Sequence, residues 1–371
     1  MKKQLITVFF IALVLMGCQG RSAGRGHAPG TDSLVTHARL LHMERGQGFT
    51  RVTVDDPWNP GAVLATYVLV PRGQELPAEL PQGTLVRTPL EHALVYSSVH
   101  TGVMKELGAF AAVRGVVDAQ YFNDSTVARG IAAGVITDCG SSMQPTIEKV
   151  INMKPDAILL SPYQDAAYGQ ITKLGTPIIE CADYMESTPL GRAEWIKFYG
   201  ELTGQRHRAD SIFNAVEQRY NDLKRQVAAH KGKRPVVLTE NVISGVWNVP
   251  GGHSYMARLI IDAGGIYPWA DDTSTGSLSL DFNQVLAVAQ KADVWLIKSF
   301  NIRSLEQLRG SYALNDRFEA FKQGQVYGCD TNATHFFERF PFHPDVLLTE
   351  YYNIFYVPAE RRQLQFFDQL K

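Results

Sequence analysis

The sequence predicts an α/β protein with two lobes joined by a single long helix, and three observations support this prediction. Helical and strand patterns alternate over most of the chain, which implies parallel strands with crossover helices. Residues 209–230 carry apolar side chains at steps of three and four with charged residues between them, which is typical of one long amphipathic helix. This helix has α/β patterns on both sides, and a chain of 371 residues is long enough for two domains.

The N-terminus has the pattern of a bacterial lipoprotein signal. Two lysines precede an apolar run that ends at Met16 and is too short for a comfortable membrane span. The sequence Leu-Met-Gly-Cys that closes this run looks like a lipobox, in which Cys18 receives a diacylglyceryl group. A plain secretory signal with a chance cysteine is the alternative. We expect a signal peptide at residues 1–17 and a lipidated N-terminus with a flexible tether at residues 18–48.

Composition excludes some classes of function. The formal net charge of −1 gives no general attraction to nucleic acid. The 45% hydrophobic and 20% charged fractions are those of a globular protein with a core. After Cys18, the cysteines Cys139, Cys181 and Cys329 remain. They allow at most one disulfide, and we expect buried thiols.

The first lobe is predicted at residues 49–190. It begins with short strands separated by Pro- and Gly-containing turns, a strand-rich extension, and then alternates helix with strand. The predicted elements are strands 51–54, 66–70, 85–87 and 93–98, helix 100–107, strand 114–117, helix 125–133, strand 135–137, helix 145–153, strand 157–160, helix 164–174 and strand 177–180.

A linking helical segment that includes the long helix is predicted at residues 191–230, and the second lobe at residues 231–371. The second lobe repeats the alternation of the first. Its predicted elements are strand 236–239, helices 254–263 and 282–289, strand 294–298, helix 315–321, strand 325–327 and a helical region from residue 345. A weak internal match supports two equivalent lobes, because residues 148–160 and 283–297 each read as a helix, a Lys-x-Asp turn and a buried strand.

Two segments resemble a known family. Residues 145–160, P-T-I-E-K-V-I-N-M-K-P-D-A-I-L-L, look like a helix and strand motif of the substrate-binding proteins that serve ABC importers of iron-siderophores, haem and cobalamin. Residues 200–223 resemble the segment that enters the interlobe helix of that family. The resemblance runs from about residue 84 to the C-terminus. It implies two Rossmann-like lobes joined by one long helix, with ligand in the cleft between them and small lobe movements.

The resemblance also implies contacts with a membrane permease. In this family an acidic residue near the start of the equivalent helix in each lobe meets arginines of the permease. Glu148 fits this position in the first lobe, where an ordinary exposed carboxylate is the alternative. The matching position in the second lobe is Asn283, a departure from the pattern. Either Asp281 takes over the contact or the docking is asymmetric.

Candidate ligand contacts follow the predicted strands, because ligands of open α/β sheets bind beyond the carboxyl ends of the strands. The run Tyr-Ser-Ser-Val-His ends a strand and begins a helix, so Ser97, Ser98 and the nearby amides could meet an acidic ligand group. N-capping by serine explains the same residues equally well. His100 closes this run.

Aromatic residues also gather at the predicted strand ends, where they would suit a large multi-ring ligand. Any single aromatic residue is more often found in the protein core than in a binding site. Trp247 and Tyr163 are the leading candidates because they lie among turn residues. The aromatic candidates are Tyr121, Tyr163, Tyr184, Trp247 and Trp269.

Histidines offer axial ligands to a chelated iron or cobalt ion. The candidates are His100, His253 and His335, although no pair has the spacing of a metal site. The chain also lacks the acidic and histidine-rich cluster expected of a receptor for bare zinc or manganese, so we assign no protein-held metal.

These observations predict a lipid-anchored substrate-binding protein of an ABC importer, which captures an iron chelate, haem or cobalamin. Its partners would be the permease with its ATPase, its ligand a small-molecule metal chelate, and its state a monomer. We expect it on the periplasmic side of the inner membrane, with the outer membrane as an alternative. Two rivals are an exported α/β enzyme, chelatase-like or hydrolytic, and a surface lipoprotein that binds ligand without a permease. Recognised catalytic motifs are absent from the sequence, so no catalytic residue is assigned.

Overall fold

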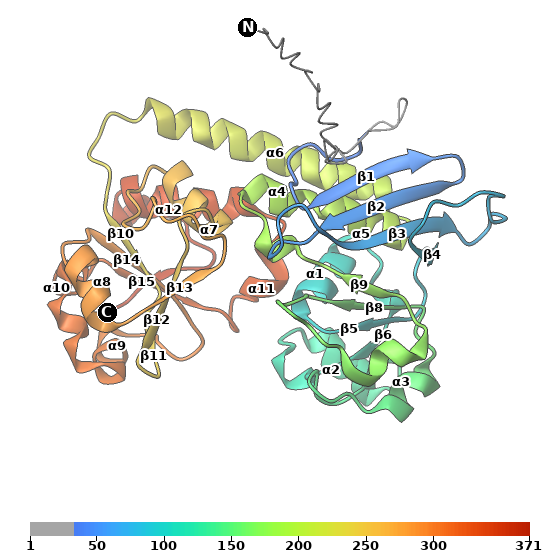
Figure 1. Cartoon of the computed structure of the whole chain (residues 1–371). Helices are drawn as coiled ribbons and strands as arrows, with labels where there is room; N and C mark the ends of the chain where they lie inside the picture. The colour runs from blue at the N-terminus through green and yellow to red at the C-terminus, as the bar shows by residue number, and fades with distance from the viewer. Residues whose placement is uncertain (1–32) are drawn as a thin grey trace, which may run out of the picture.

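The computed structural model describes residues 33–371 (Figure 1). The predicted signal peptide and the lipidation site Cys18 lie outside the described residues. Within residues 33–371, no helix combines the length and the hydropathy needed to cross a membrane. The cysteines in the same range, Cys139, Cys181 and Cys329, are buried thiols without disulfides.

A mixed four-stranded sheet opens the described chain. Its order is β1-β2-β3-β4, antiparallel except for the parallel pair β3 and β4. Its strands are β1 (Leu41–Gly46), β2 (Phe49–Asp55), β3 (Val63–Pro71) and β4 (Thr84–Thr88). The predicted tether of residues 18–48 is therefore wrong at its C-terminal end. Leu41 and Met43 alternate with more exposed residues and are buried against the core, so the apolar alternation of a strand begins earlier than predicted.

The first α/β lobe contains a parallel five-stranded sheet with the order β7-β6-β5-β8-β9. This order places the first strand of the lobe in the middle, as in a Rossmann-like sheet. The strands are β5 (Ala93–Val95), β6 (Val113–Val116), β7 (Thr137–Asp138), β8 (Ala157–Leu160) and β9 (Ile178–Glu180), and the α-helices between them are α1 (Ser98–Glu106), α2 (Ser125–Ala132) and α3 (Ile147–Met153). The helix predicted at residues 164–174 is reduced to a 3₁₀ helix, η3 (Gly169–Leu174).

The long helix is α6 (Arg206–Ala229), which follows α4 (Pro189–Glu194) and α5 (Ile196–Thr203). At 1.5 Å per residue its 24 residues extend about 36 Å. It packs against α5 on one side and against α12 (Pro344–Tyr356) of the second lobe on the other. Figure 1 shows α6 running across both lobes. A single α-helix thus joins the lobes, and its predicted amphipathic stripe is buried at Ala209, Phe213, Val216 and Tyr220.

The second lobe combines a mostly parallel sheet with an antiparallel sheet. The first has the order β10-β14-β15-β16 and the second β11-β12-β13. The strands are β10 (Val237–Thr239), β11 (Val242–Ile243), β12 (Val246–Pro250), β13 (Ser277–Leu280), β14 (Val294–Ser299), β15 (Val326–Asp330) and β16 (Asp368–Gln369), and the remaining helices include α7 (Tyr255–Asp262), α8 (Phe282–Ala289), α9 (Leu305–Ser311), α10 (Glu319–Lys322) and α11 (Phe336–Arg339). One apolar cluster extends from β1 through α6 to α12, so the lobes share packed side chains at the hinge.

Candidate functional site

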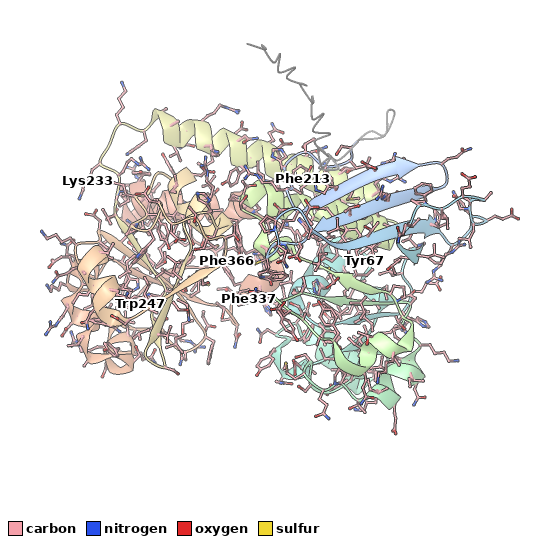
Figure 2. The ribbon with its side chains drawn as sticks, viewed as in Figure 1. Tyr67, Phe213, Lys233, Trp247, Phe337 and Phe366 are labelled. Carbon is pink, nitrogen blue, oxygen red and sulfur yellow. The ribbon has the colours of Figure 1, made fainter. Side chains whose placement is uncertain are left out.

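Two adjoining cavities lie between the lobes, and together they form the interlobe cleft. The linker-side cavity has a volume of about 300 Å³, and the strand-end cavity about 410 Å³. Both include Val99 and Phe337 in their walls. Figure 2 shows Phe337 in the space between the two lobes. The linker-side cavity is also lined by Ser161, Asp183, Tyr184, Arg192, Tyr255, Met256, Lys298, Phe336 and Phe340, and the strand-end cavity by Tyr96, Ser97, Ser98, Asp118, Gln120, Tyr121, Phe122, Asn123, Phe300, Thr331 and Asn332.

The cleft lies where parallel strands of both lobes end. Ser97 follows β5, Asp118 follows β6 and Ser161 follows β8, while Phe300 follows β14 and Thr331 follows β15. Each of these residues lies one or two positions beyond the last residue of its strand. The site therefore has the position expected for ligands of open α/β sheets.

A buried arginine forms part of the linker-side cavity. The Nε atom of Arg192 donates to Asp183 Oδ2 at 3.0 Å, and Nη1 donates to the hydroxyl of Tyr255. The guanidinium carbon lies 4.6 Å from the centre of the Tyr255 ring. Burial raises the pKa of the Asp183 carboxyl, although the guanidinium opposes that shift. Since Tyr255 belongs to α7 and Asp183 precedes the interlobe helix, Arg192 connects the two sides of the cleft.

A second cation comes from the other lobe. Lys298 lies near the carboxyl end of β14, and its ammonium group pairs with the carboxylate of Glu240. Both side chains are largely buried. Lys298 lines the same cavity as Arg192. The linker-side cavity is therefore lined by two cations, and each is paired with a carboxylate that fixes its position.

Exposed aromatic rings line the strand-end cavity. Tyr121, Phe300 and Phe337 are 70%, 64% and 49% exposed, and they come from both lobes. Burial raises the pKa of Tyr96 and of Tyr184 to about 12, so both phenols are neutral at physiological pH. Large apolar rings that surround a cavity and remain in contact with water are suited to cover a large flat ligand.

Several predicted ligand contacts lie on this cleft. Ser97, Ser98 and Tyr121 line the strand-end cavity, and Tyr184 lines the linker-side cavity. The hydroxyl of Ser97 also accepts a hydrogen bond from the amide of Val99 at 3.3 Å, so it caps α1 as the alternative interpretation expected. The Tyr184 hydroxyl donates to the carbonyl oxygen of Pro162.

His100 does not line the cleft, and its prediction as a ligand contact is wrong. It is fully buried, and its Nδ1 atom lies 2.8 Å from the hydroxyl of Tyr199. Burial lowers the pKa of His100 to about 3, so the ring is neutral. The helical period explains the error, because His100 shares the inward face of α1 with Val103 and Met104.

Trp247 is likewise a core residue. It lies in β12, is fully buried, and stacks on Trp295 at a ring distance of 5.6 Å. Its Nε1 atom donates to the carbonyl oxygen of Thr239 at 2.9 Å. Trp269 is half-buried beside Tyr267 and lines neither cleft cavity. The turn residues around Trp247 belong to a hairpin, and the alternation of β12 directs the indole into the core.

Three other candidates lie away from both cleft cavities. Tyr163 is half-exposed and packs edge-on against Tyr168. His335 lines a third interlobe cavity of about 770 Å³, which adjoins the strand-end cavity at Asn123. His253 lines a cavity on the hinge side of the molecule. In the described part of the chain, no group of three or more His, Cys, Asp or Glu side chains is arranged to hold a metal ion.

The predicted docking residues lie on exposed helix starts. Glu148 is exposed in the first turn of α3. Asp281 caps α8, and its carboxylate accepts a hydrogen bond from the amide of Gln284 at 2.9 Å. Asn283 is exposed in the first turn of α8. The two helices precede corresponding strands, since α3 leads into β8 and α8 leads into β14.

The sequence analysis missed most of the cleft residues that carry charge or aromatic rings. Arg192 was assigned only to a helical segment, and Phe337 lies in α11, a four-residue helix without a detectable period. Lys298 did leave a signal, because a single cation closes an otherwise apolar strand, V-W-L-I-K. A charged residue at the carboxyl end of a buried parallel strand is a candidate ligand contact.

Comparison with known proteins decides the family. A family model described as periplasmic binding protein matches residues 94–333. The chain belongs to the periplasmic binding protein family. This family consists of substrate-binding transport proteins and not of enzymes. The four-stranded sheet β1–β4 precedes the matched region of this periplasmic binding protein.

Curated relatives and solved structures agree with this assignment. Two uncharacterized lipoproteins of Methanocaldococcus jannaschii are each 28% identical to this periplasmic binding protein, over 262 and 202 residues, which cover 67% and 52% of the chain. The chain spans 61% and 51% of the lengths of these relatives.

Among solved structures, an ABC transporter substrate-binding protein from Listeria monocytogenes has a TM-score of 0.55 at 20% identity and covers 72% of this chain and 100% of its own. A periplasmic heme binding protein from Pseudomonas aeruginosa has a TM-score of 0.54 at 17% identity, with coverages of 76% and 98%. These similarities establish the two-lobed fold.

Proposed function

We propose that this protein is the lipid-anchored substrate-binding component of an ABC importer, and that it captures a metal chelate in the interlobe cleft. The observation that carries the proposal is the composition of the cleft. Aromatic rings from both lobes line it, together with Arg192 from α4 and Lys298 from β14. The cargo would be an iron-siderophore, haem or cobalamin.

The shape of the cleft favours a multi-ring cargo, while its charge is balanced, because the cations Arg192 and Lys298 and the carboxylates Asp183 and Asp118 all line it. Carboxylate or catecholate groups of the ligand would meet Arg192 and Lys298, whose own partners orient them toward the cavity. The rings of Tyr121, Phe300 and Phe337 would cover the apolar faces of the ligand. Solved structures with the same fold include heme-binding proteins of Pseudomonas aeruginosa and Vibrio cholerae, which supports haem as one candidate.

The metal would enter with its own ligands. Among the described residues that line the two cleft cavities there is no histidine or cysteine. Oxygen donors are present in Tyr121 and Tyr184. A ferric siderophore needs no donor from the protein, whereas haem bound here would take its axial ligand from Met256 or from a tyrosine of the lining.

Binding would involve small movements of the lobes. The continuous helix α6 and the apolar cluster that both lobes share resist wide opening. The ion pair between Arg219 on α6 and Asp345 on α12, at 2.6 Å, adds a further link to the second lobe. Elements packed in this way shift by small displacements and not by hinge opening.

Delivery would use the exposed helix starts of α3 and α8. Glu148 carries a free carboxylate for a permease arginine in the first lobe. In the second lobe the Asp281 carboxylate is already hydrogen-bonded as a helix cap, so we propose an asymmetric contact through Asn283 with Asp281 beside it. The lipid on Cys18 would hold the protein at the periplasmic side of the inner membrane, and relatives named as lipoproteins support this anchor.

A binding panel on residues 19–371 tests the function. The panel contains haem, cobalamin, a ferric catecholate and a ferric hydroxamate. Binding of each is measured by tryptophan fluorescence and visible absorption. Saturable submicromolar binding of one class, with the ligand recovered unchanged, supports the proposal and names the cargo. Failure of every chelate to bind would refute it. If the purified protein binds a chelate but Glu148→Arg leaves cellular uptake of that chelate unchanged, the result would favour a surface lipoprotein that works without a permease.

A further inference from the structure

A large cavity lies on the hinge side of the molecule, and we call it the hinge-face cavity. Its volume is about 760 Å³. Its walls come from residues 36–39 of the N-terminal segment, residues 187–190 before and within α4, and parts of α6 and α7. Figure 1 shows α4, α6 and α7 close together at the junction of the lobes.

Helices α4 and α7 contribute to both the hinge-face cavity and the ligand cleft. Helices α4 and α7 contact each other. Leu190 of α4 and Arg258 of α7 line the hinge-face cavity, whereas Arg192 of α4 and Tyr255 of α7 line the cleft. The hinge-face cavity is therefore a separate site that contacts both lobes.

Positive charge exceeds negative charge in this cavity. The charged side chains in its wall, histidines aside, are the cations Arg39, Lys224 and Arg258 and the carboxylate Asp262. Asp262 already pairs with Arg258 at 2.9 Å and with Lys224 at 3.1 Å, and it accepts a hydrogen bond from Tyr220 at 2.8 Å. Among the described residues, Arg39 has no carboxylate partner.

The two histidines in the wall do not reverse this balance. His37 pairs with Glu217 at 2.8 Å, and Glu217 does not line the cavity. His253 is exposed and adds no negative charge. Two buried carboxylates lie behind this wall, and both already have donors. Glu194 accepts hydrogen bonds from Lys197 and from backbone amides of the N-terminal segment. Glu186 accepts them from the amides of Arg39 and Leu40 and from the indole of Trp195.

One further polar side chain completes the site. Asn221 contributes an amide from α6. Cations that outnumber the carboxylates, next to an amide donor, match the requirements of a phosphate or carboxylate group.

We propose that the hinge-face cavity binds a phosphate- or carboxylate-bearing group, with Arg39 and Lys224 as its cationic contacts. The group belongs either to a soluble small molecule or to a lipid headgroup. This site is independent of the transport function, because it shares no lining residue with the cleft. An anion bound there would link the N-terminal segment, α4, α6 and α7, so its binding stabilises the folded protein.

The test is a titration of the protein, residues 19–371, with inorganic phosphate at constant ionic strength, followed by the thermal midpoint of unfolding. We expect a saturable rise in the wild type. Arg39→Gln and Lys224→Met should each weaken the apparent affinity about tenfold, because each removes one charge-assisted contact. The matched control is Arg225→Gln. Arg225 follows Lys224 in sequence, is exposed, pairs with Asp222 and does not line the cavity.

Vesicles distinguish the two sources of the anion. Binding to phosphatidylglycerol but not phosphatidylcholine vesicles, weakened by Arg39→Gln and competed by phosphate, assigns the site to a lipid headgroup. A phosphate response without vesicle binding assigns it to a soluble anion. The proposal is overturned when neither probe binds saturably, or when Arg39→Gln and Lys224→Met respond like Arg225→Gln.

Discussion

Replacement of Glu194 by glutamine should loosen the N-terminal segment from the linker between the lobes. The Oε2 atom of Glu194 accepts hydrogen bonds from the amides of Thr36, His37 and Ala38, at 2.9, 2.6 and 2.9 Å. Its Oε1 atom accepts from the ammonium group of Lys197 at 2.8 Å. The carboxylate is fully buried. Both carboxylate oxygens therefore accept hydrogen bonds from N–H donors. In the glutamine side chain an NH₂ group replaces one of these oxygens, and it cannot accept a hydrogen bond from the donors on that side.

The expected loss of unfolding free energy is about 3 kcal/mol. Hydrogen bonds to charged groups contribute about 1.5–3 kcal/mol each, and removal of one partner of a buried pair costs about 3–5 kcal/mol. The glutamine retains one carbonyl oxygen, which places the loss near the lower end of that range. Such a loss is a large part of the roughly 5–15 kcal/mol that stabilises a typical protein.

The assay is urea unfolding followed by tryptophan fluorescence, with Glu217→Gln as the matched control. Glu217 also holds the segment, through His37 at 2.8 Å, but that pair is partly exposed. The control should lose less than about 1 kcal/mol. A loss below about 1 kcal/mol for Glu194→Gln, or one equal to the control, would refute the argument that this buried carboxylate fixes the segment.

The pH dependence supplies a second test of the same residue. Burial alone would raise the pKa of Glu194, but hydrogen bonds from Lys197 and from the amides of Ala38 and His37 lower it below its ordinary value. A lowered folded pKa means that the stabilisation is complete above the unfolded pKa and is lost as the pH falls through the folded pKa. The difference between wild type and Glu194→Gln should therefore shrink below about pH 4.5.

Four further changes have defined outcomes. Burial raises the pKa of the Glu350 carboxyl to about 7. The folded protein therefore keeps a proton that the unfolded chain has released, so the unfolding free energy of the wild type should fall as the pH rises from about 4.5 to about 7 and stay level above that. Glu350→Gln should remove this fall, which amounts to about 2–3 kcal/mol between pH 5 and pH 9 in urea unfolding. Gly102→Ala would place a Cβ atom 2.2 Å from the Glu338 carbonyl oxygen. The substitution should lower the unfolding free energy by about 1–3 kcal/mol, because it pushes α1 away from α11. The control is Gly310→Ala, whose added Cβ atom meets no atom within 4 Å. Lys298→Gln should weaken binding of an acidic chelate at least about tenfold in fluorescence titrations, and an unchanged affinity would remove Lys298 from the site. Glu148→Arg should abolish uptake in cells while leaving the ligand affinity of the purified protein unchanged.

The long helix and the alternation of strands were predictable because their signals are local. The apolar stripe of α6 repeats within a few residues, so no knowledge of its partners is needed to find it. The predicted start at residue 209 was three residues late because the helix begins with the polar run Arg206–Arg208. The strand ends were also predictable, and with them the position of Ser97 and Tyr121 on the cleft.

Side-chain direction and long-range pairing were not predictable in the same way. His100 lies two residues after Ser98, and this step along a helix turns a side chain from the cleft to the core. Trp247 is preceded by Ser244 and Gly245, which suggest a loop, but they form the tight turn of a hairpin whose next strand is buried on one face. The guanidinium of Arg192 packs on the ring of Tyr255, which lies far along the chain, and this long-range contact leaves no local signal in the sequence.

On the proposed function, the arrangement of α3 and α8 would let a permease sense a ligand that moves the lobes only slightly. Helix α3 leads into β8, and Ser161 directly beyond β8 lines the cleft. Helix α8 leads into β14, whose Lys298 and following Phe300 line the cleft from the other side. On the proposed function, each docking helix is therefore separated from the ligand by one buried strand. Packed interiors transmit strain, so on this proposal Glu148 and Asn283 would report the ligand through β8 and β14. Uptake should consequently be more sensitive to substitutions within β8 and β14 than ligand affinity is, and equal sensitivity of the two would show that the permease reads the lobes in another way.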